Sequence, residues 1–514
     1  MHGARAGGEM MGKPIFYALA AALAWITPVV AGAAPAPTQP ADAVPRRFVS
    51  DHRLQVGGHE IRYRAVVEEH FLADPGGQRT ASVFTTSYER TDLPRGTVRP
   101  VMFVFNGGPG SASLWLQMGL VGPKRIAFGD PVKPETVPPF AVVDNDDTPL
   151  DVADIVLIDP PGTGFSKILP AGKPKDYYGA DADAAATVKV IEDWVRGHGR
   201  WNAPKYLLSE SYGTVRAALV ARLLAGGPME TGRMDGVTLN GVILLGQALD
   251  MRDKGDLAYQ TALPTMAATA CYFGRVQAEC TPAGQAEAAR ALAAGDYGRA
   301  LYAGSALPDA ERSAVAARLS TLIGLPRGAI EGADLRISPG AFSHMLLADR
   351  GEQLGLYDGR FTLPLKASGG DPVADDPAMG QYVPGFVASF NGYERGELGV
   401  TIDSDYQAIG FRDVNAHWDY GSGPGVPAAH DFADDLAIAM RRNPQLRLMV
   451  GCGYYDLMTT LGSAEYTIAH AGIPLAATRF HYYPAGHMSY LGDAPRRALA
   501  ADLRAFVTAA PAAR

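Results

Sequence analysis

Apolar positions follow two different patterns along this 514-residue chain. From residue 53 to residue 90 they alternate with polar positions, as in Glu60-Ile-Arg-Tyr-Arg-Ala-Val-Val67, which predicts antiparallel edge strands. Later runs are continuously apolar, as expected of strands that are covered on both faces. These runs, and a last strand near the C-terminus, are predicted at residues 100–105, 154–159, 205–208, 241–245, 446–450 and 479–483.

Helical patterns separate these strands. They are predicted at residues 180–196, 217–224, 431–442, 463–471 and 493–509. Strands that alternate with helices indicate a parallel sheet with helices on both faces. The predicted fold class is therefore α/β, with a central, mostly parallel sheet built from residues 47–250 and 391–514.

The stretch between these two parts has a different composition. Strand-like runs disappear from residue 251 to residue 390, and alanine-rich helical segments replace them. One such segment has Pro308 at its start and Gly324 past its end, which is how helices commonly begin and end. We expect residues 251–390 to form a mostly helical insertion, a cap domain over the carboxyl ends of the strands.

The first 46 residues differ from all the rest. Lys13 precedes an uncharged run over residues 15–30, and Ala31-Gly-Ala33 has the small-x-small pattern of a cleavage site. We expect a signal peptide over residues 1–33, a Pro/Ala-rich linker over 34–46, and a secreted or periplasmic mature protein with no membrane attachment. The alternative is a membrane anchor, although the run is short for a span of about 20 residues and contains Pro28.

Charge and cysteine content narrow the function classes. The net charge is −8 without a basic block, so nothing indicates a nucleic-acid partner. Cys271 and Cys280 are close enough in sequence to form a short-loop disulfide, while Cys452, in an apolar strand end, is expected to be a small buried thiol. No Cys/His spacing suggests a metal site, and no cofactor is implied. The oligomeric state stays open, with a homodimer as one alternative.

A candidate nucleophile lies where the run at 205–208 passes into a strong helix former. The sequence Ser209-Glu-Ser-Tyr-Gly213 predicts a strand, a sharp turn and a helix. A nucleophile at such a turn needs small residues two positions before and after it, and Ser211 has Ser209 and Gly213. Ser209 is the weaker candidate, because Leu207 would crowd its turn. So short a pattern also occurs by chance in ordinary loops.

Two further residues complete a candidate triad. Asp456 follows the predicted strand at 446–450, and His487 follows the one at 479–483. Functional side chains of an open α/β sheet lie just past the carboxyl ends of strands. The chain order Ser211, Asp456, His487 is the order of an α/β-hydrolase. Taken singly, the aspartate could be a turn former and the histidine a structural residue, as we expect for His481 inside the strand.

Several motifs resemble the serine carboxypeptidase family, which includes cathepsin A, and suggest a bacterial-type member. They are Asn106-Gly-Gly-Pro-Gly-Ser-Ala-Ser-Leu114 with Gly122-Pro123, Ile158-Asp-Pro-Pro-Gly-Thr-Gly-Phe-Ser166, Glu210-Ser-Tyr-Gly213 and Gly486-His487. The resemblance implies an α/β-hydrolase fold with a helical insertion. It also implies that Ser211 is the nucleophile, His487 the proton shuttle and Asp456 its orienting acid. It further implies an oxyanion hole made by the N–H groups of Gly108 and Tyr212. The residues that it implies for binding the substrate carboxylate are Asn106, Gly107 and Glu210.

The carboxylate-binding group departs from the family pattern. A charged Glu210 would repel a substrate carboxylate, so it can bind one only as a neutral acid, which favours acidic pH. The family shares this task with a second glutamate, and the corresponding position here is Leu120. Phe105 also replaces the usual tryptophan.

Three functions are consistent with these residues. The first is a serine-type carboxypeptidase that releases C-terminal residues of peptides through an acyl-enzyme. The second is an esterase or acyltransferase with the same triad, which Leu120 would permit. The third is a non-catalytic binding protein, which the intact triad argues against. The side-chain preference at the scissile bond is not readable from the sequence.

Overall fold

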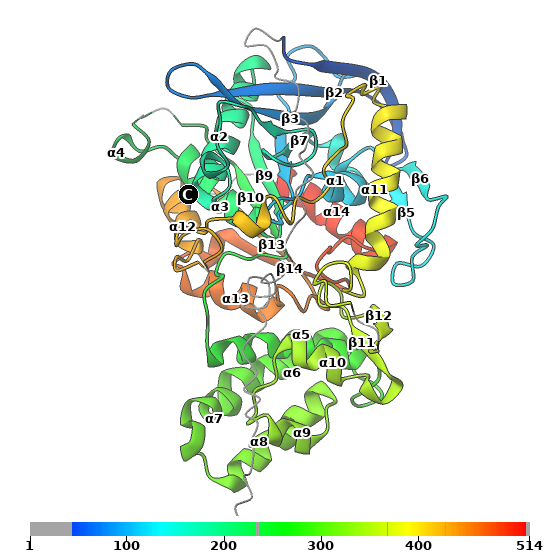
Figure 1. Ribbon diagram of the computed structural model, residues 1–514, viewed down its shortest axis with the longest axis vertical. Coiled ribbons are helices and arrows are strands. Elements are labelled where there is room, and N and C mark those ends of the chain that lie inside the picture. Colours follow the sequence, from blue (N-terminus) through cyan, green and yellow to red (C-terminus); the bar gives the residue numbers. More distant parts are fainter. Residues whose placement is uncertain (1–43, 233, 235, 367–368, 427, 510–514) are drawn as a thin grey trace, which may run out of the picture. The chain divides into compact units, whose positions relative to one another are not determined.

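The computed structural model describes residues 44–509 except 233, 235, 367–368 and 427 (Figure 1). The predicted signal peptide and the predicted linker up to residue 43 lie outside the described residues. Within those described residues, no helix combines the length and the hydropathy needed to cross a membrane.

The described part of the chain is built on a ten-stranded sheet in the order β1, β2, β3, β7, β4, β9, β10, β13, β14, with β8 beside β3. The strands β1, β2, β3 and β7 pair antiparallel, and all pairs from β7 to β14 are parallel. Both predictions, the antiparallel edge and the parallel centre, are confirmed. The bounds are β1 Arg47–Val56, β2 His59–Ala73, β3 Arg79–Arg90, β4 Val101–Phe105, β7 Asp154–Asp159, β8 Lys167–Ile168, β9 Lys205–Glu210, β10 Gly241–Leu245, β13 Arg447–Gly453 and β14 Thr478–Tyr483.

The parallel strands are buried on both faces because helices cover each side. Along β4, Val101 and Phe103 belong to one hydrophobic cluster, and Met102 and Val104 to the other. This alternation is what a continuously apolar strand predicts. One cluster includes α2 (Ala180–Gly197), α3 (Gly213–Leu224), α12 (Ala433–Arg442) and α13 (Leu461–His470); the other includes α1 (Leu114–Leu116), α11 (Met379–Gly396) and α14 (Asp493–Thr508) (Figure 1).

The helices between β10 and α11 have a hydrophobic cluster of their own, which includes Leu263, Leu319 and Phe342. Figure 1 shows them grouped together. The helix α8 begins after Pro308 and ends at Gly324, whose φ is 69°, as the sequence predicts. The bounds are α5 Asp256–Tyr272, α6 Pro282–Leu292, α7 Gly298–Ala303, α8 Asp309–Ile323, α9 Arg327–Gly332 and α10 Pro339–Met345.

Some elements differ from the sequence-based expectation. A small hairpin, β11 (Glu352–Leu354) with β12 (Thr362–Pro364), lies in the stretch expected to lack strands, because three-residue strands are too short to show alternation. The helix α11 crosses the predicted boundary at residue 390. The division into 47–250, 251–390 and 391–514 stays a prediction. The remaining strands and α-helix among the described residues are β5 (Lys124–Ala127), β6 (Ala141–Asp144) and α4 (Pro228–Thr231).

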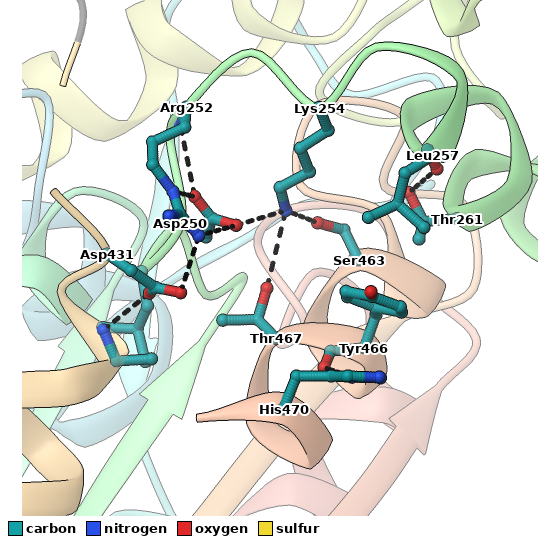
Figure 2. Close-up of polar contacts among 12 residues, drawn as sticks. Asp250, Arg252, Lys254, Leu257, Thr261, Asp431, Ser463, Tyr466, Thr467 and His470 are labelled. Atoms are coloured by element: carbon teal, nitrogen blue, oxygen red, sulfur yellow. Dashed lines mark hydrogen bonds and ion pairs between the residues drawn. The ribbon is translucent and has the colours of Figure 1, made fainter. Parts of the chain in front are cut away.

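A polar cluster fixes the chain where it leaves the sheet for α5 (Figure 2). Lys254 donates to the hydroxyl of Ser463 on α13 at 2.9 Å and lies 3.6 Å from the carboxylate of Asp250. Arg252 pairs with Asp250 and, at 3.0 Å, with Asp431 before α12. Burial lowers the pKa of Lys254, while Asp250 opposes that shift. The cluster therefore ties the start of α5 to two helices that pack on the sheet.

Candidate active site

Ser211 lies at the sharp turn between β9 and α3. Its φ of 60° is in the left-handed region, which residues other than glycine seldom adopt. The N–H of Ser211 donates to the carbonyl of Leu245, at the end of β10, at 3.0 Å. Thr214 in α3 donates its hydroxyl hydrogen to the carbonyl of Ser211 at 2.7 Å. These bonds hold the turn from both sides and leave the Ser211 side chain partly exposed.

The glycine-rich loop after β4 lies directly against this turn. A Cβ atom at Gly107 would be 2.5 Å from the amide nitrogen of Tyr212. A Cβ atom at Gly213 would be 3.0 Å from the carbonyl oxygen of Asn106. Larger residues at these positions would push the loop and the turn apart, so both glycines are needed for the two motifs to meet.

The two residues predicted for the oxyanion hole, Gly108 and Tyr212, are brought to this contact. Within the described part of the chain, neither backbone N–H has a hydrogen-bond acceptor. Tyr212 also precedes α3 directly, and a helix N-terminus favours nearby negative charge. Unpaired N–H groups in such a place are suited to bind the oxyanion that forms in acyl transfer.

Asp456 and His487 form a buried, directly bonded pair. His487 Nδ1 lies 2.9 Å from Asp456 Oδ2, and the two side chains are 5% and 1% exposed. The backbone N–H groups of Met458 and Thr459 donate to Asp456 Oδ1 at 3.0 and 2.8 Å, and the Thr459 hydroxyl donates to Oδ2 at 2.5 Å. Burial acts to lower the pKa of His487, but the carboxylates of Asp456, Glu210 and Asp376 together outweigh it, so the pKa is raised overall. Because Nδ1 is committed to Asp456, Nε2 is free to accept a proton.

The imidazole of His487 lies against the backbone that supports Ser211. A Cβ atom at Gly246 would be 3.0 Å from His487 Nδ1, and Gly246 follows Leu245, the acceptor of the Ser211 N–H. In the described part of the chain, His487 has no hydrogen bond to Ser211 Oγ. Such bonds often form only when substrate is bound. The three predicted triad residues are therefore brought into one cluster with the proton transfer contact still open.

The loop that holds His487 is clamped by a segment next to the small hairpin. The N–H of His487 donates to the carbonyl of Tyr357 at 2.6 Å, and the N–H of Gly486 donates to Asp358 Oδ2 at 3.1 Å. Arg360 donates to the carbonyl of Pro484 at 2.8 Å. We call residues 357–360 the clamp segment. Nothing in the sequence pattern of this segment indicates its contact with the histidine loop.

Asn106 and Glu210 are also brought together. Asn106 Nδ2 donates to Glu210 Oε1 at 3.1 Å, and both side chains are buried. Burial raises the pKa of Glu210 to about 7, while His487 opposes the shift. The acid is therefore protonated at mildly acidic pH and has a hydrogen to donate.

Leu120, at the position of the family's second acid, is fully buried in the hydrophobic core and contributes no polar side chain. A polar group that the sequence reasoning missed lies beside it. The ring of Tyr490 packs against Gly119, where a Cβ atom would be 2.3 Å from Tyr490 Cε2. Tyr490 is close enough to Glu210 for each to shift the pKa of the other, although the two side chains do not meet hydrogen-bond geometry.

A buried ion pair supports the loop and the turn from behind. Arg216 on α3 donates to Asp183 Oδ2 on α2 at 2.7 Å and to the carbonyl of Asn106 at 2.6 Å. Arg216 and Asp183 are both fully buried, and the ring of Tyr212 lies 5.5 Å from the guanidinium carbon. An arginine among the apolar residues of the first turns of α3 was the available sequence signal for this contact.

The cysteines lie outside this cluster. Cys271 and Cys280 form a disulfide with their Cα atoms 5.9 Å apart. Cys452 is a buried free thiol, and burial raises its pKa. Within the described residues, no group of three or more His, Cys, Asp or Glu side chains is arranged to hold a metal ion.

The motifs and their geometry agree with the comparison to known families. Residues 75–282 match the family model described as serine carboxypeptidase. This region of the chain is similar to the serine carboxypeptidase family. The resemblance stated from the motifs is thereby confirmed, and the match supports a serine hydrolase. A search of curated proteins found no match.

One solved structure shows the same fold. The chain is similar to Kex1(delta)p, a prohormone-processing carboxypeptidase from Saccharomyces cerevisiae, with a TM-score of 0.53 at 12% identity over 86% of this chain and 90% of that one. It is more distantly similar to a proline iminopeptidase from Mycobacterium smegmatis, with a TM-score of 0.35 at 13% identity over 85% of this chain and 97% of that one. The α/β-hydrolase fold that the sequence predicts for this chain is confirmed.

Proposed function

We propose that this chain is a serine-type carboxypeptidase that removes C-terminal residues from peptides through an acyl-enzyme. Ser211 Oγ attacks the scissile carbonyl carbon while His487 Nε2 accepts the hydroxyl proton. The same proton then passes to the leaving amine, and an ester joins the acyl group to Ser211. A water molecule attacks that ester and His487 accepts its proton. The bond between the acyl carbon and Ser211 Oγ then breaks, His487 returns the proton to Ser211 Oγ, and the acid product leaves. The N–H groups of Gly108 and Tyr212 stabilise the oxyanion in both steps.

The observation that favours a carboxypeptidase over a general esterase is the buried pair Asn106 and Glu210 next to Ser211. Glu210 has a pKa of about 7 because it is buried. In its neutral form it donates to a carboxylate, and above that pH it repels one. Asn106 Nδ2 has a second hydrogen for the same ligand. Gly107 keeps the glycine-rich loop close enough for both side chains to act on one group.

The decisive experiment compares N-blocked dipeptides that have a free C-terminus with their C-terminal amides. A panel of Ala, Leu, Phe and Lys at the last position allows for an unknown side-chain preference. We expect cleavage of the free acids and a sharp loss with the amides, with no turnover in Ser211→Ala. Equal rates on the two series would sink the carboxypeptidase assignment, and a lack of labelling by a serine-directed phosphonate would sink the serine hydrolase mechanism.

A second candidate, an esterase or acyltransferase with the same triad, is favoured by one observation. Leu120 is fully buried and apolar, so the family's second acid is missing from the carboxylate-binding group. This function predicts turnover of simple esters that does not depend on a free carboxylate. The same panel, extended with N-blocked amino acid methyl esters, separates the two candidates.

A further inference from the structure

Three buried polar side chains lie on the carboxylate-binding side of Ser211. Asn106 is 2% exposed, Glu210 5% and Tyr490 2%. Asn106 donates to one oxygen of Glu210, but the other oxygen, Oε2, and the hydroxyl of Tyr490 have no hydrogen-bond partner within the described residues. Tyr490 nevertheless lies close enough to Glu210 and Asn106 for its hydroxyl to interact with both, outside good hydrogen-bond geometry. Leaving buried polar atoms without a well-formed hydrogen bond destabilises a fold, so these two neighbouring atoms point to a ligand that pairs with both.

The position of Tyr490 depends on its neighbours. It follows His487 by three residues, so the loop that supplies the histidine also supplies the phenol. Its ring occupies the space beside Gly119, where any side chain would overlap it. The next residue, Leu120, adds only apolar surface. Because residue 119 is glycine, the Tyr490 ring fits beside it. Its hydroxyl therefore lies near Leu120, the position at which the family has its second acid.

We propose that the hydroxyl of Tyr490 donates a hydrogen bond to the substrate's C-terminal carboxylate, together with neutral Glu210 and the free hydrogen of Asn106 Nδ2. In this arrangement Glu210 Oε2 and Tyr490 Oη, the two unpaired atoms, become the donors that meet the ligand. Tyr490 is thus a specificity-determining residue that takes the place of the second acid. The inference rests on the proposed carboxypeptidase function and adds a residue to it.

This substitution changes how binding depends on pH. Burial raises the pKa of the Tyr490 hydroxyl well above its ordinary value, so it stays a donor throughout the neutral range. Besides burial, the pKa of Glu210 responds to His487 and Asp456 from the strand-end loops, to Tyr490 and to Asn106, and Glu210 in turn raises the pKa of Tyr382 of α11. Only Glu210 in the carboxylate-binding group has to gain a proton to bind. Log KM for a free acid should therefore rise with pH with a limiting slope of one, whereas two acids would give a slope of two.

The test is Tyr490→Phe, which removes one oxygen and keeps the ring beside Gly119. We expect KM for the free-acid dipeptide to rise about 10- to 100-fold, as for loss of a hydrogen bond to a charged group. Hydrolysis of an N-blocked methyl ester, which has no carboxylate, should be unchanged and also shows that the variant is folded. The matched control is Tyr297→Phe, which removes an equally buried hydroxyl that donates to the carbonyl of Leu335 at 2.8 Å.

Each outcome decides the proposal. An unchanged KM in Tyr490→Phe, or a limiting slope of two in the wild type, overturns the role of Tyr490 and leaves the carboxypeptidase function standing. Equal wild-type rates on free and amidated dipeptides overturn both. A selective rise of KM for the free acid, with a limiting slope of one, supports the role of Tyr490.

Discussion

Two histidine–aspartate pairs have the same N–O distance, and their histidines are six residues apart in sequence. The surroundings of the two pairs are different. His487 Nδ1 is 2.9 Å from Asp456 Oδ2, and His481 Nδ1 is 2.9 Å from Asp502 Oδ2. The first pair is nearly inaccessible to solvent, whereas the side chains of the second are 31% and 32% exposed. His481 lies inside β14, and His487 lies just past its end.

The two aspartates also differ in the number of hydrogen bonds that they accept, and the buried one accepts more. Asp456 accepts two backbone N–H bonds and the hydroxyl of Thr459, so its orientation is fully determined. Besides its contact with His481, Asp502 accepts a hydrogen bond from the hydroxyl of Tyr483 and is about one-third exposed. A short contact between an imidazole and a carboxylate is therefore not enough to identify a catalytic site. A strand-end position, burial and complete hydrogen bonding distinguish the candidate site from it.

The largest expected effect on kcat comes from removing the hydroxyl of Ser211, the proposed nucleophile. Ser211→Ala should lower kcat by about 10⁶, as for loss of a nucleophile from a working triad. Ser209→Ala makes the same change two residues earlier, at a buried hydroxyl bonded to the carbonyl of Ile243, and should leave kcat within a few-fold. Steady-state rates on one dipeptide measure both. Near-normal activity in Ser211→Ala would show that another residue is the nucleophile.

The comparison itself is tested by changing each aspartate to asparagine. Asp456→Asn should lower kcat by about 10⁴, because an amide no longer holds the required imidazole tautomer. Asp502→Asn should leave kcat nearly unchanged, because its histidine lies within a strand away from Ser211. Circular dichroism on both variants controls for folding. Equal losses in the two variants would contradict the distinction between the pairs.

A third expectation concerns the acid beside the buried histidine. With the pKa of Glu210 at about 7, KM of the wild type for a free-acid dipeptide should rise about tenfold from pH 6 to pH 8, as the acid ionises and repels the substrate. Glu210→Gln keeps a donor at every pH, so its KM should stay flat across that range. A methyl ester substrate, which does not meet this group, corrects for the titration of His487. A wild-type KM independent of pH would refute the role of Glu210.

The smallest effect should come from the hydroxyl partners of the two aspartates. Thr459→Val removes the hydroxyl donor to Asp456 and should lower kcat about 2- to 10-fold, the size of one ordinary hydrogen bond. Thr459→Ser keeps the hydroxyl and should restore the rate. Tyr483→Phe removes the hydroxyl donor to Asp502 and should have no effect on kcat. If Thr459→Val and Tyr483→Phe behave alike, the hydrogen bonds around Asp456 do not tune the site.

The sequence was most informative where burial leaves a simple pattern. The parallel strands were predictable because both of their faces are covered, so their residues are apolar without interruption. The same pattern located the strand ends, and with them Ser211, Asp456 and His487. The hairpin of β11 and β12 was missed because its strands are too short for any periodicity.

The residues that the sequence did not reveal act through contacts that are remote along the chain. Tyr490 reaches Glu210 only because Gly119 makes room for its ring, and neither position is unusual by itself. Arg216 reaches Asn106 across the gap between α3 and the glycine-rich loop. The local sign in the sequence was Gly119 followed by Leu120, which stands where the family has an acid. A glycine there leaves space that the ring of Tyr490 occupies.

The clamp segment has a consequence for engineering. Residues 357–360 belong to the stretch between α10 and α11, yet they hold the backbone of His487 and of the residues just before it. A chimera that exchanges the whole stretch for that of a relative would therefore also replace the support of His487, the proposed general base. Grafts that leave Tyr357, Asp358 and Arg360 in place would keep the hydrogen bonds that hold the His487 loop.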